Sequence, residues 1–298
     1  MKTISFLFNL SKRDIMKLKL AIISDIHYGP NTFTKIGEKA HELTESFIEA
    51  VNAADYDLVV ELGDRVTDVD QSTDIQSLIA VADLFRSCSV PCQHLLGNHD
   101  MVNMGREENE DILQCDMNST YLDTDVVRLI FWRPEVRIKK GIGFPLLSDD
   151  LEWLEETLNT APNKAVIFNH VPISGHSQYG NYYFQNNHEF STYPEYERIL
   201  ELAVQNLNTA AWISGHVHWN TFNNMNGIPM ITIQSLTECF TTYPNPSGAW
   251  AEVEISENQI TCQIKGIDPL SISAPLIDRN IAAWHPPLGV FNENKTRG

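Results

Sequence analysis

The chain has 298 residues, of which 43% are hydrophobic, and a formal net charge of −18 at pH 7. This composition can form a substantial core and excludes an intrinsically disordered protein. The acidic balance argues against a nucleic-acid polymer as a partner, because such binding needs a basic surface. Five scattered cysteines exclude a disulfide framework and favour thiols in a reducing compartment, so we expect a cytoplasmic protein.

The N-terminal stretch resembles a secretory signal only weakly. Its apolar run is short, and SKRD follows where a small-residue cleavage site would stand. Met16 opens KLKLAIIS and is an alternative translation start, so residues 1–15 are predicted to be an N-terminal extension. No run approaches the roughly 18 apolar residues of a membrane span, and no membrane is expected as a partner.

Short apolar runs and amphipathic segments alternate along the chain. The runs predicted as buried strands are 18–24, 58–62, 94–96, 126–132, 165–168, 211–214 and 230–233. Apolar residues at helical spacing predict helices over 33–52, 72–87 and 148–158. Residues 251–255 and 260–264 flank SENQ and predict a β-hairpin. Alternation of strands and helices predicts an α/β fold.

We predict one catalytic domain over residues 16–271 and an extended C-terminal arm over residues 272–298. The arm is apolar enough to pack on its own domain or on a second subunit of a homo-oligomer. Within the domain, residues 174–197 are rich in tyrosine and phenylalanine and are interpreted as an aromatic lid. Ordinary packing or a subunit contact is the alternative interpretation of this segment.

Five of the predicted strands end in residues that can bind a metal or carry a proton. The groups are Asp25-Ile26-His27, Gly63-Asp64, Gly97-Asn98-His99, His170 and Gly215-His216-Val217-His218. Because strand ends on one edge of an α/β sheet converge, two Asp, one Asn and five His are expected to meet there. Carboxylates and imidazoles bind Zn, Fe and Mn, and this number of ligands suits two ions that share one carboxylate.

In this order, the motifs DIH, GD, GNHD, a single His and GHVH resemble the calcineurin-like metallophosphoesterase superfamily over residues 18–233. The resemblance implies the metallophosphatase fold, a four-layer α-β-β-α sandwich of two mixed sheets flanked by helices. It also implies two metal ions, of Fe, Mn or Zn. Carried over by motif, the ligands of metal one are Asp25, His27, Asp64 and His218, and those of metal two are Asp64, Asn98, His170 and His216.

The resemblance further implies that His99 faces the substrate, where it stabilises phosphoryl oxygens or protonates the leaving group. Many members pair this histidine with an aspartate three residues after the GD aspartate, but Thr67 occupies that position here. Asp68 and Asp100 are the alternative partners, and Asp68 is our second candidate catalytic residue. The expected nucleophile is a metal-activated water.

Thr67 also stands where purple acid phosphatases carry a ligating tyrosine, and His99 stands where lipid A pathway pyrophosphatases carry arginine. The remaining resemblance is to the cyclic-nucleotide and glycerophosphodiester phosphodiesterase branch. We therefore predict a hydrolase whose partner is a small phosphorylated substrate, namely a phosphodiester. A phosphomonoesterase or nucleotide-diphosphate hydrolase of the same fold is the first alternative, and a non-catalytic scaffold is the second.

Overall fold

The computed structural model describes residues 17–174, 178–281 and 284–285. The predicted N-terminal extension, residues 1–15, lies outside this part of the chain. The first sheet contains β1 (Lys17–Ile23), β2 (Leu58–Glu61), β3 (Cys92–His94), β10 (Trp250–Ser256), β11 (Gln259–Lys265) and β12 (Leu270–Pro275). The second contains β4 (Thr120–Asp123), β5 (Arg128–Phe131), β6 (Ala165–Phe168), β7 (Thr209–Ser214), β8 (Thr221–Met225) and β9 (Ile228–Thr232).

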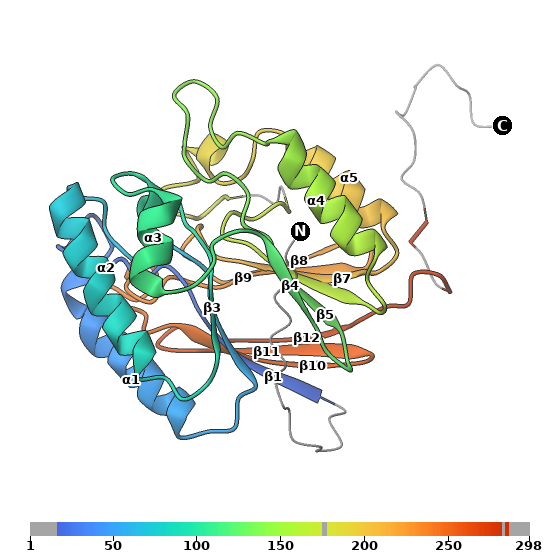
Figure 1. Cartoon of the computed structure of the whole chain (residues 1–298), viewed down its shortest axis with the longest axis horizontal. Coiled ribbons are helices and arrows are strands. Elements are labelled where there is room, and N and C mark those ends of the chain that lie inside the picture. The colour runs from blue at the N-terminus through green and yellow to red at the C-terminus, as the bar shows by residue number, and fades with distance from the viewer. Residues whose placement is uncertain (1–16, 175–177, 282–283, 286–298) are drawn as a thin grey trace.

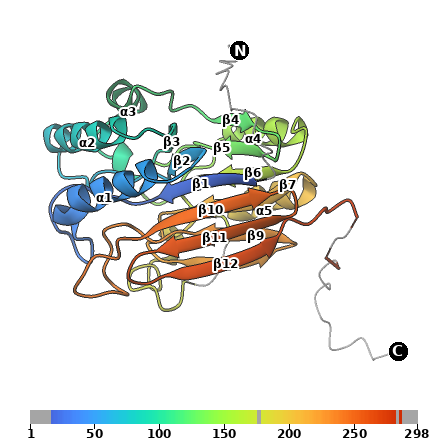
Figure 2. The ribbon, with the colours of Figure 1, turned by 90° about the horizontal axis from the view of Figure 1, so that it is seen from below.

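Both six-stranded sheets are mixed. Their strand orders are β12-β11-β10-β1-β2-β3 and β4-β5-β6-β7-β9-β8. In the first sheet β1, β2 and β3 are parallel, whereas β10, β11 and β12 form an antiparallel meander on the far side of β1 (Figure 2). The predicted hairpin is therefore β10–β11, and it extends the sheet that carries the first three motifs.

The two sheets lie face to face, and their facing sides form the main core (Figure 1). Leu20 and Ile22 of β1 point into this core, where the rings of Phe131 and Phe168 stack with centroids 5.6 Å apart. Ala21 and Ile23 point to the opposite face, toward the helices. A strand buried on both faces reads as a continuous apolar run, which is why β1 was recognisable in the sequence.

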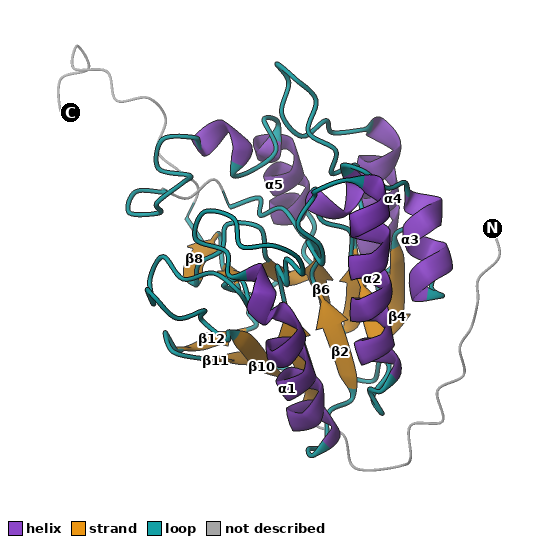
Figure 3. Ribbon diagram, turned by 90° about the vertical axis from the view of Figure 1, so that its left-hand side faces the viewer, coloured by secondary structure: helices purple, strands orange, loops and turns teal. Residues whose placement is uncertain are grey.

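Helices cover the outer face of the second sheet and the β1–β3 side of the first (Figure 3). The helices α1 (Ala40–Asn52) and α2 (Gln71–Arg86) pack on the first sheet, and α3 (Arg106–Leu113) packs beside α2. The helices α4 (Ser148–Asn159) and α5 (Tyr196–Gln205) pack on the second sheet. Three short 3-10 turns are η1 (Gly37–Lys39), η2 (His99–Met101) and η3 (His188–Phe190). The predicted four-layer α-β-β-α sandwich is confirmed.

The predicted helix over residues 33–52 is wrong in its first third, because α1 begins only at Ala40. A Cβ on Gly37 would lie 2.6 Å from the backbone oxygens of both His27 and Gly29. The chain before Gly37 is therefore pressed against the loop that follows β1 and cannot coil as a helix. The strands β4, β8 and β12 and the helices α3 and α5 were not predicted, since each is short or only half buried.

The predicted start of the C-terminal arm at residue 272 is also wrong, because it cuts through the edge strand β12. After β12 the chain stays on its own domain: the Arg279 guanidinium donates to the carbonyl oxygens of Ala203 and Asn206 at 3.2 and 3.1 Å. Residues 286–298 of the predicted arm lie outside the described residues. The five cysteines are free thiols, as predicted. Among the described helices, none has the length and apolar character needed to cross a membrane.

Candidate metal centre

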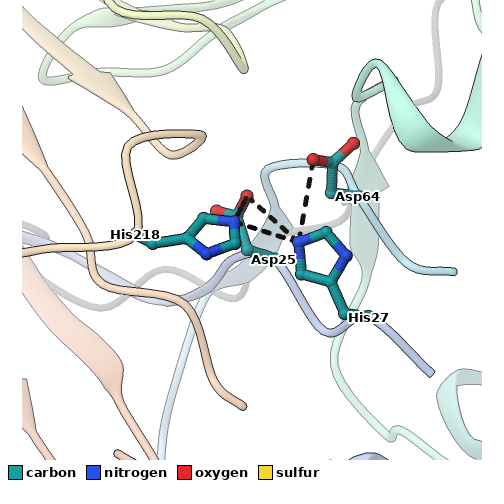
Figure 4. A group of neighbouring side chains, drawn as sticks. All are labelled: Asp25, His27, Asp64 and His218. Carbon is teal, nitrogen blue, oxygen red and sulfur yellow. Dashed lines mark hydrogen bonds and ion pairs between the residues drawn. The ribbon is translucent and has the colours of Figure 1, made fainter. Parts of the chain in front are cut away.

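The structure brings the predicted ligand residues together at one edge of the two sheets. Ligand atoms of Asp25, His27, Asp64 and His218 all lie within 4.8 Å of one another, and Figure 4 shows these four side chains. Ligand atoms of Asp64, His170 and His216 form a second group with the same spacing. Asn98 completes this group, since its Oδ1 lies 3.3 Å from His170 Nε2. Asp64 belongs to both groups, which is the position predicted for a bridging carboxylate.

The backbone turns sharply where it delivers these side chains. Asp25, His27, Asp64, His216 and His218 all have positive φ values, between 47° and 67°. A residue other than glycine in this left-handed region costs about 1–3 kcal/mol, and such residues are concentrated at functional sites. Here the conformation occurs where the chain leaves β1, β2 and β7, and it directs the ligand side chains toward one another.

Two glycines allow the strand ends to approach closely. A Cβ on Gly97 would lie 2.1 Å from Asp64 Oδ1. A Cβ on Gly215 would lie 1.9 Å from Ser24 Oγ and 2.6 Å from Asp25 Oδ2. Any side chain at either position would displace a carboxylate of the cluster, so the glycines in GNHD and GHVH have a steric role.

The donor set fits two metal ions. Asp25 Oδ1 and Asp64 Oδ2 are buried and accept no hydrogen bond from the described residues. The Nε2 atoms of His27 and His218 lie only 3.0 Å apart, and His218 Nε2 lies 3.3 Å from Asp25 Oδ1. Buried carboxylate oxygens without a donor are unfavourable, and a cation bound between them would supply the missing partner.

Hydrogen bonds behind the cluster fix which imidazole nitrogen faces it. His218 Nδ1 donates to Glu238 Oε2 at 2.9 Å, and His170 Nδ1 donates to the Leu62 carbonyl at 2.9 Å. His216 uses the other nitrogen, since its Nε2 donates to the Phe190 carbonyl at 2.8 Å. Such contacts leave the opposite nitrogen free to bind a metal. Sequence analysis did not identify Glu238 as the partner of His218, because residues 237–240 (TECF) do not belong to any of the strand-end motifs.

Charges in the cluster favour the deprotonated carboxylates that metal binding needs. Burial alone would raise the pKa of Asp64, but His170 and His99 hold it well below its usual range. Burial lowers the pKa of His216 to about 3, which leaves a neutral imidazole. Burial opposes protonation of His170 as well, yet Asp64 raises its pKa to about 9. A metal ion would therefore displace a proton from His170 on binding.

His99 lies beside the cluster and pairs with Asp68. Its Nδ1 hydrogen-bonds to Asp68 Oδ1, and its Nε2 lies 4.0 Å from Asp64 Oδ2. The other candidate, Asp100, is fully buried and accepts hydrogen bonds from the backbone N–H groups of Asp64, Arg65 and Gly97 at 2.8–2.9 Å. Asp100 thus fixes the loop geometry, and Asp68 is the carboxylate that orients His99.

A pocket of about 420 Å³ opens onto the cluster. Its polar lining is Lys35, Asp64, Asp68, Asn98, His99, Asn181, His216 and His218, and its apolar and aromatic lining is Phe33, Val102, Ile138, Tyr182, Tyr183, Phe184, Phe190 and Val217. Four of the aromatic residues come from the predicted lid segment, 174–197. Tyr193 of the same segment is instead buried against Trp132 and Phe144, so part of the segment serves ordinary packing.

Comparison with known proteins agrees with this geometry. The family model of calcineurin-like phosphoesterases matches residues 18–220. A dimetal phosphatase from Danio rerio has a similar structure, with a TM-score of 0.69 and 15% identity over 86% of this chain and 99% of that one. A purple acid phosphatase from yellow lupin seeds is also similar, with a TM-score of 0.62 and 13% sequence identity over 87% of this chain and 53% of that one.

GAP50, the anchor in the inner membrane complex of Plasmodium, also has a similar structure, with a TM-score of 0.58 and 15% identity over 87% of this chain and 89% of that one. At these identities the likenesses concern the fold. No curated protein matches the sequence. The family match covers more than half of the chain and includes all seven predicted ligands, and the chain therefore belongs to the calcineurin-like phosphoesterases, a family of metal-dependent phosphoric ester hydrolases.

Proposed function

We propose that this protein hydrolyses small phosphodiesters at a dinuclear metal centre, with water as the nucleophile. The observation that carries the proposal is the pair of ligand groups that share Asp64 and open, together with His99, onto one pocket. Iron, manganese and zinc are the proposed ions, because histidine, aspartate and asparagine ligands accept all three.

When bound, the two ions would supply positive charge for the phosphoryl oxygens and lower the pKa of a water molecule. The first would be held by Asp25, His27, Asp64 and His218, and the second by Asp64, Asn98, His170 and His216. The proposal involves no covalent intermediate on the protein, and the described residues that line the pocket include no Ser, Thr or Cys.

His99 is proposed to act on the leaving group. Its Nδ1 is held by Asp68, so Nε2 is the nitrogen that can reach the substrate. A proton delivered from Nε2 to the leaving oxygen would neutralise the alkoxide as it forms, and Asp68 stabilises the imidazolium that donates it. The side chain is 25% exposed, which is consistent with contact to a substrate in the pocket.

The pocket supports an organic phosphate with an aromatic group. Its volume lies within the range of about 300–1,000 Å³ that small-molecule sites occupy. Tyr182, Tyr183, Phe184 and Phe190 offer ring surface for stacking on a base or an aryl group. Cyclic nucleotides and nucleotide- or glycerol-type diesters are the proposed substrates, on the strength of the motif resemblance described above.

Two alternatives remain within this fold. A phosphomonoesterase or a nucleotide-diphosphate hydrolase would use the same metal ligands. A non-catalytic scaffold or anchor is the other, and GAP50, described as an anchor, is similar in structure, but the complete ligand set and the His99–Asp68 pair favour catalysis. The cytoplasmic location and a homo-oligomeric state stay as predictions.

The first experiment is to load the metal-free protein with manganese and to compare hydrolysis of bis(p-nitrophenyl) phosphate with that of p-nitrophenyl phosphate. Asp64→Asn, which alters the shared ligand, is the inactive control. A clear preference for the diester would support the phosphodiesterase. A preference for the monoester would move the protein to the first alternative, and hydrolysis of neither ester would favour the anchor.

A further inference from the structure

Lys35 is a buried cation on the wall of the pocket. Its side chain is 9% exposed, and it is the one Lys or Arg among the described residues that line the pocket. Its ammonium makes no hydrogen bond or ion pair with any residue that the structure describes, although Asp64 and Asp68 line the same pocket. Lys35 Nζ retains some exposure to solvent. It is not one of the fully buried side-chain atoms that lack a hydrogen-bond partner among the described residues.

The backbone holds Lys35 in a fixed position. Lys35 N–H donates to the Thr32 carbonyl at 2.9 Å, and Thr32 N–H donates back to the Lys35 carbonyl at 3.0 Å. On either side of Lys35, Ile36 N–H donates to Thr237 O, and Cys239 N–H donates to Thr34 O, both at 2.9 Å. The segment therefore pairs with the one that carries Glu238, the partner of His218, and Lys35 is anchored beside the first ligand group.

The pocket already holds the positive charge of Lys35 beside the ligand residues His216 and His218. Metal ions at the cluster would add further positive charge. With metal ions bound, an anion in the pocket would stabilise the Lys35 ammonium, which makes no direct ion pair with Asp64 or Asp68 in the described chain.

We propose that Lys35 is a substrate-contacting residue whose ammonium binds a non-bridging phosphoryl oxygen of the substrate. The inference rests on the proposed function, since it places the phosphoryl group between the cluster and Lys35. An ammonium is a point charge with three rotatable donors, which suits a phosphoryl oxygen. Because the contact exists in the ground state as well as during reaction, it contributes chiefly to KM rather than to kcat.

Lys35→Met removes the charge and keeps most of the side-chain volume, and Lys35→Arg keeps the charge. Lys39→Met is the matched control, because Lys39 lies in the same part of the chain but pairs with the exposed Glu42 at 2.8 Å. Each manganese-loaded protein is titrated with inorganic phosphate by calorimetry. Its metal content is measured, and KM and kcat are determined with bis(p-nitrophenyl) phosphate.

In Lys35→Met we expect unchanged metal content, phosphate affinity lower by about 10- to 100-fold, and a matching rise in KM. Lys35→Arg should retain most of the affinity, and Lys39→Met should equal the wild type. Equal phosphate affinity in Lys35→Met and wild type would overturn the proposal, as would loss of metal from Lys35→Met. If phosphate affinity depends on Lys35 but the wild type hydrolyses neither ester, the proposed function fails and the anion site stands.

Discussion

Glu238 accepts a hydrogen bond from Nδ1 of His218 at 2.9 Å, and its other carboxylate oxygen accepts the N–H groups of Cys239 and Phe240 at 2.9 and 3.0 Å. The carboxylate is therefore held on one side and orients the imidazole on the other. This arrangement directs His218 Nε2 toward Asp25.

Glu238→Ala should lower manganese affinity at the first site by about 10- to 100-fold, which is the usual cost of losing such a partner of a metal-binding histidine. The manganese affinity of Glu238→Gln should lie between those of wild type and Glu238→Ala, because the glutamine amide oxygen still accepts the hydrogen bond but carries no charge. Calorimetric titration with manganese measures both. Glu252→Ala is the control, since Glu252 accepts a hydrogen bond from Tyr56 outside the cluster. Equal manganese affinities for Glu238→Ala and Glu252→Ala would show that Glu238 does not support metal binding by His218.

Asn98→Ala should reduce the bound manganese from two ions toward one per chain and lower turnover. The amide oxygen of Asn98 lies 3.3 Å from His170 Nε2, and the carboxylate of the second group, Asp64, is already shared with the first. Metal content by atomic absorption gives the direct readout. Asn103→Ala, which loses only a hydrogen bond to Asp74, is the comparison. Full metal content and full activity in Asn98→Ala would contradict the ligand assignment.

His99→Ala should keep both metal ions and slow hydrolysis by about 10²- to 10⁴-fold, the range for loss of a general acid. Asp68→Asn should give a smaller loss, because the imidazole remains but its partner no longer carries a charge. Steady-state kinetics with bis(p-nitrophenyl) phosphate test both variants. His188→Ala serves as the control, since His188 is exposed and lies outside the pocket. An unchanged rate in His99→Ala would remove this residue from the mechanism.

Gly215→Ala should fold but lose metal at the first site. The added Cβ would meet Ser24 Oγ and the Asp25 carboxylate, so Asp25 must move away from the cluster. Gly105→Ala adds the same methyl group at a position where the nearest atom is 3.5 Å away, in the Glu108 side chain. Circular dichroism reports whether each variant folds, and metal content reports whether the first site is occupied. Normal metal content in Gly215→Ala would show that the strand ends can move apart without loss of metal binding.

Arg65→Met should destabilise the metal-free protein by about 3–5 kcal/mol at pH 7, the cost of removing one partner from a buried ion pair. The Arg65 guanidinium pairs with Glu61 and, at 3.0 Å, with Asp100, and all three side chains are fully buried. Urea denaturation at pH 7 gives the free energy of unfolding. A decrease in the free energy of unfolding of less than about 1 kcal/mol would mean that Glu61 and Asp100 find other partners when the guanidinium is removed.

The ion pair between Glu61 and Arg65 also makes the free energy of unfolding depend on pH. Burial would raise the pKa of Glu61, but Arg65 and His94 lower it below the ordinary 4.5. A depressed pKa stabilises the fold above the unfolded-state value, and this stabilisation is lost as the pH falls through the folded-state value. Burial raises the pKa of Asp100, the other partner of Arg65, to about 6. The difference in stability between wild type and Arg65→Met should therefore shrink as the pH falls, first as Asp100 is protonated and then below pH 4.5 as Glu61 is protonated, and a constant difference would argue against the ion pairs as its source.

Much of the fold could be predicted from the sequence, because its signals are local. The strand β1 ends in the continuous apolar run Leu20–Ile23, and α2 has its apolar residues on one face behind the N-cap Asp70. Edge elements such as β4 and β12 bury few residues, none in β4 and only Ile272 and Ala274 in β12, so their apolar patterns were weak. The start of α1 depended on Gly37 lying against the loop of residues 27–30, a tertiary contact that the apolar spacing does not report.

The sequence by itself determined the types and order of the proposed ligand residues, since each motif begins within three residues of a strand end and strand ends converge. Only the tertiary structure decided between Asp68 and Asp100, because Asp68 lies 31 residues before His99 along the chain and yet faces it, whereas the adjacent Asp100 accepts backbone N–H groups inside the loop. Glu238 and Lys35 likewise gained their places beside the cluster through pairing between segments about 200 residues apart. Contacts of that range are set by how the two sheets pack, and that packing has no local signature.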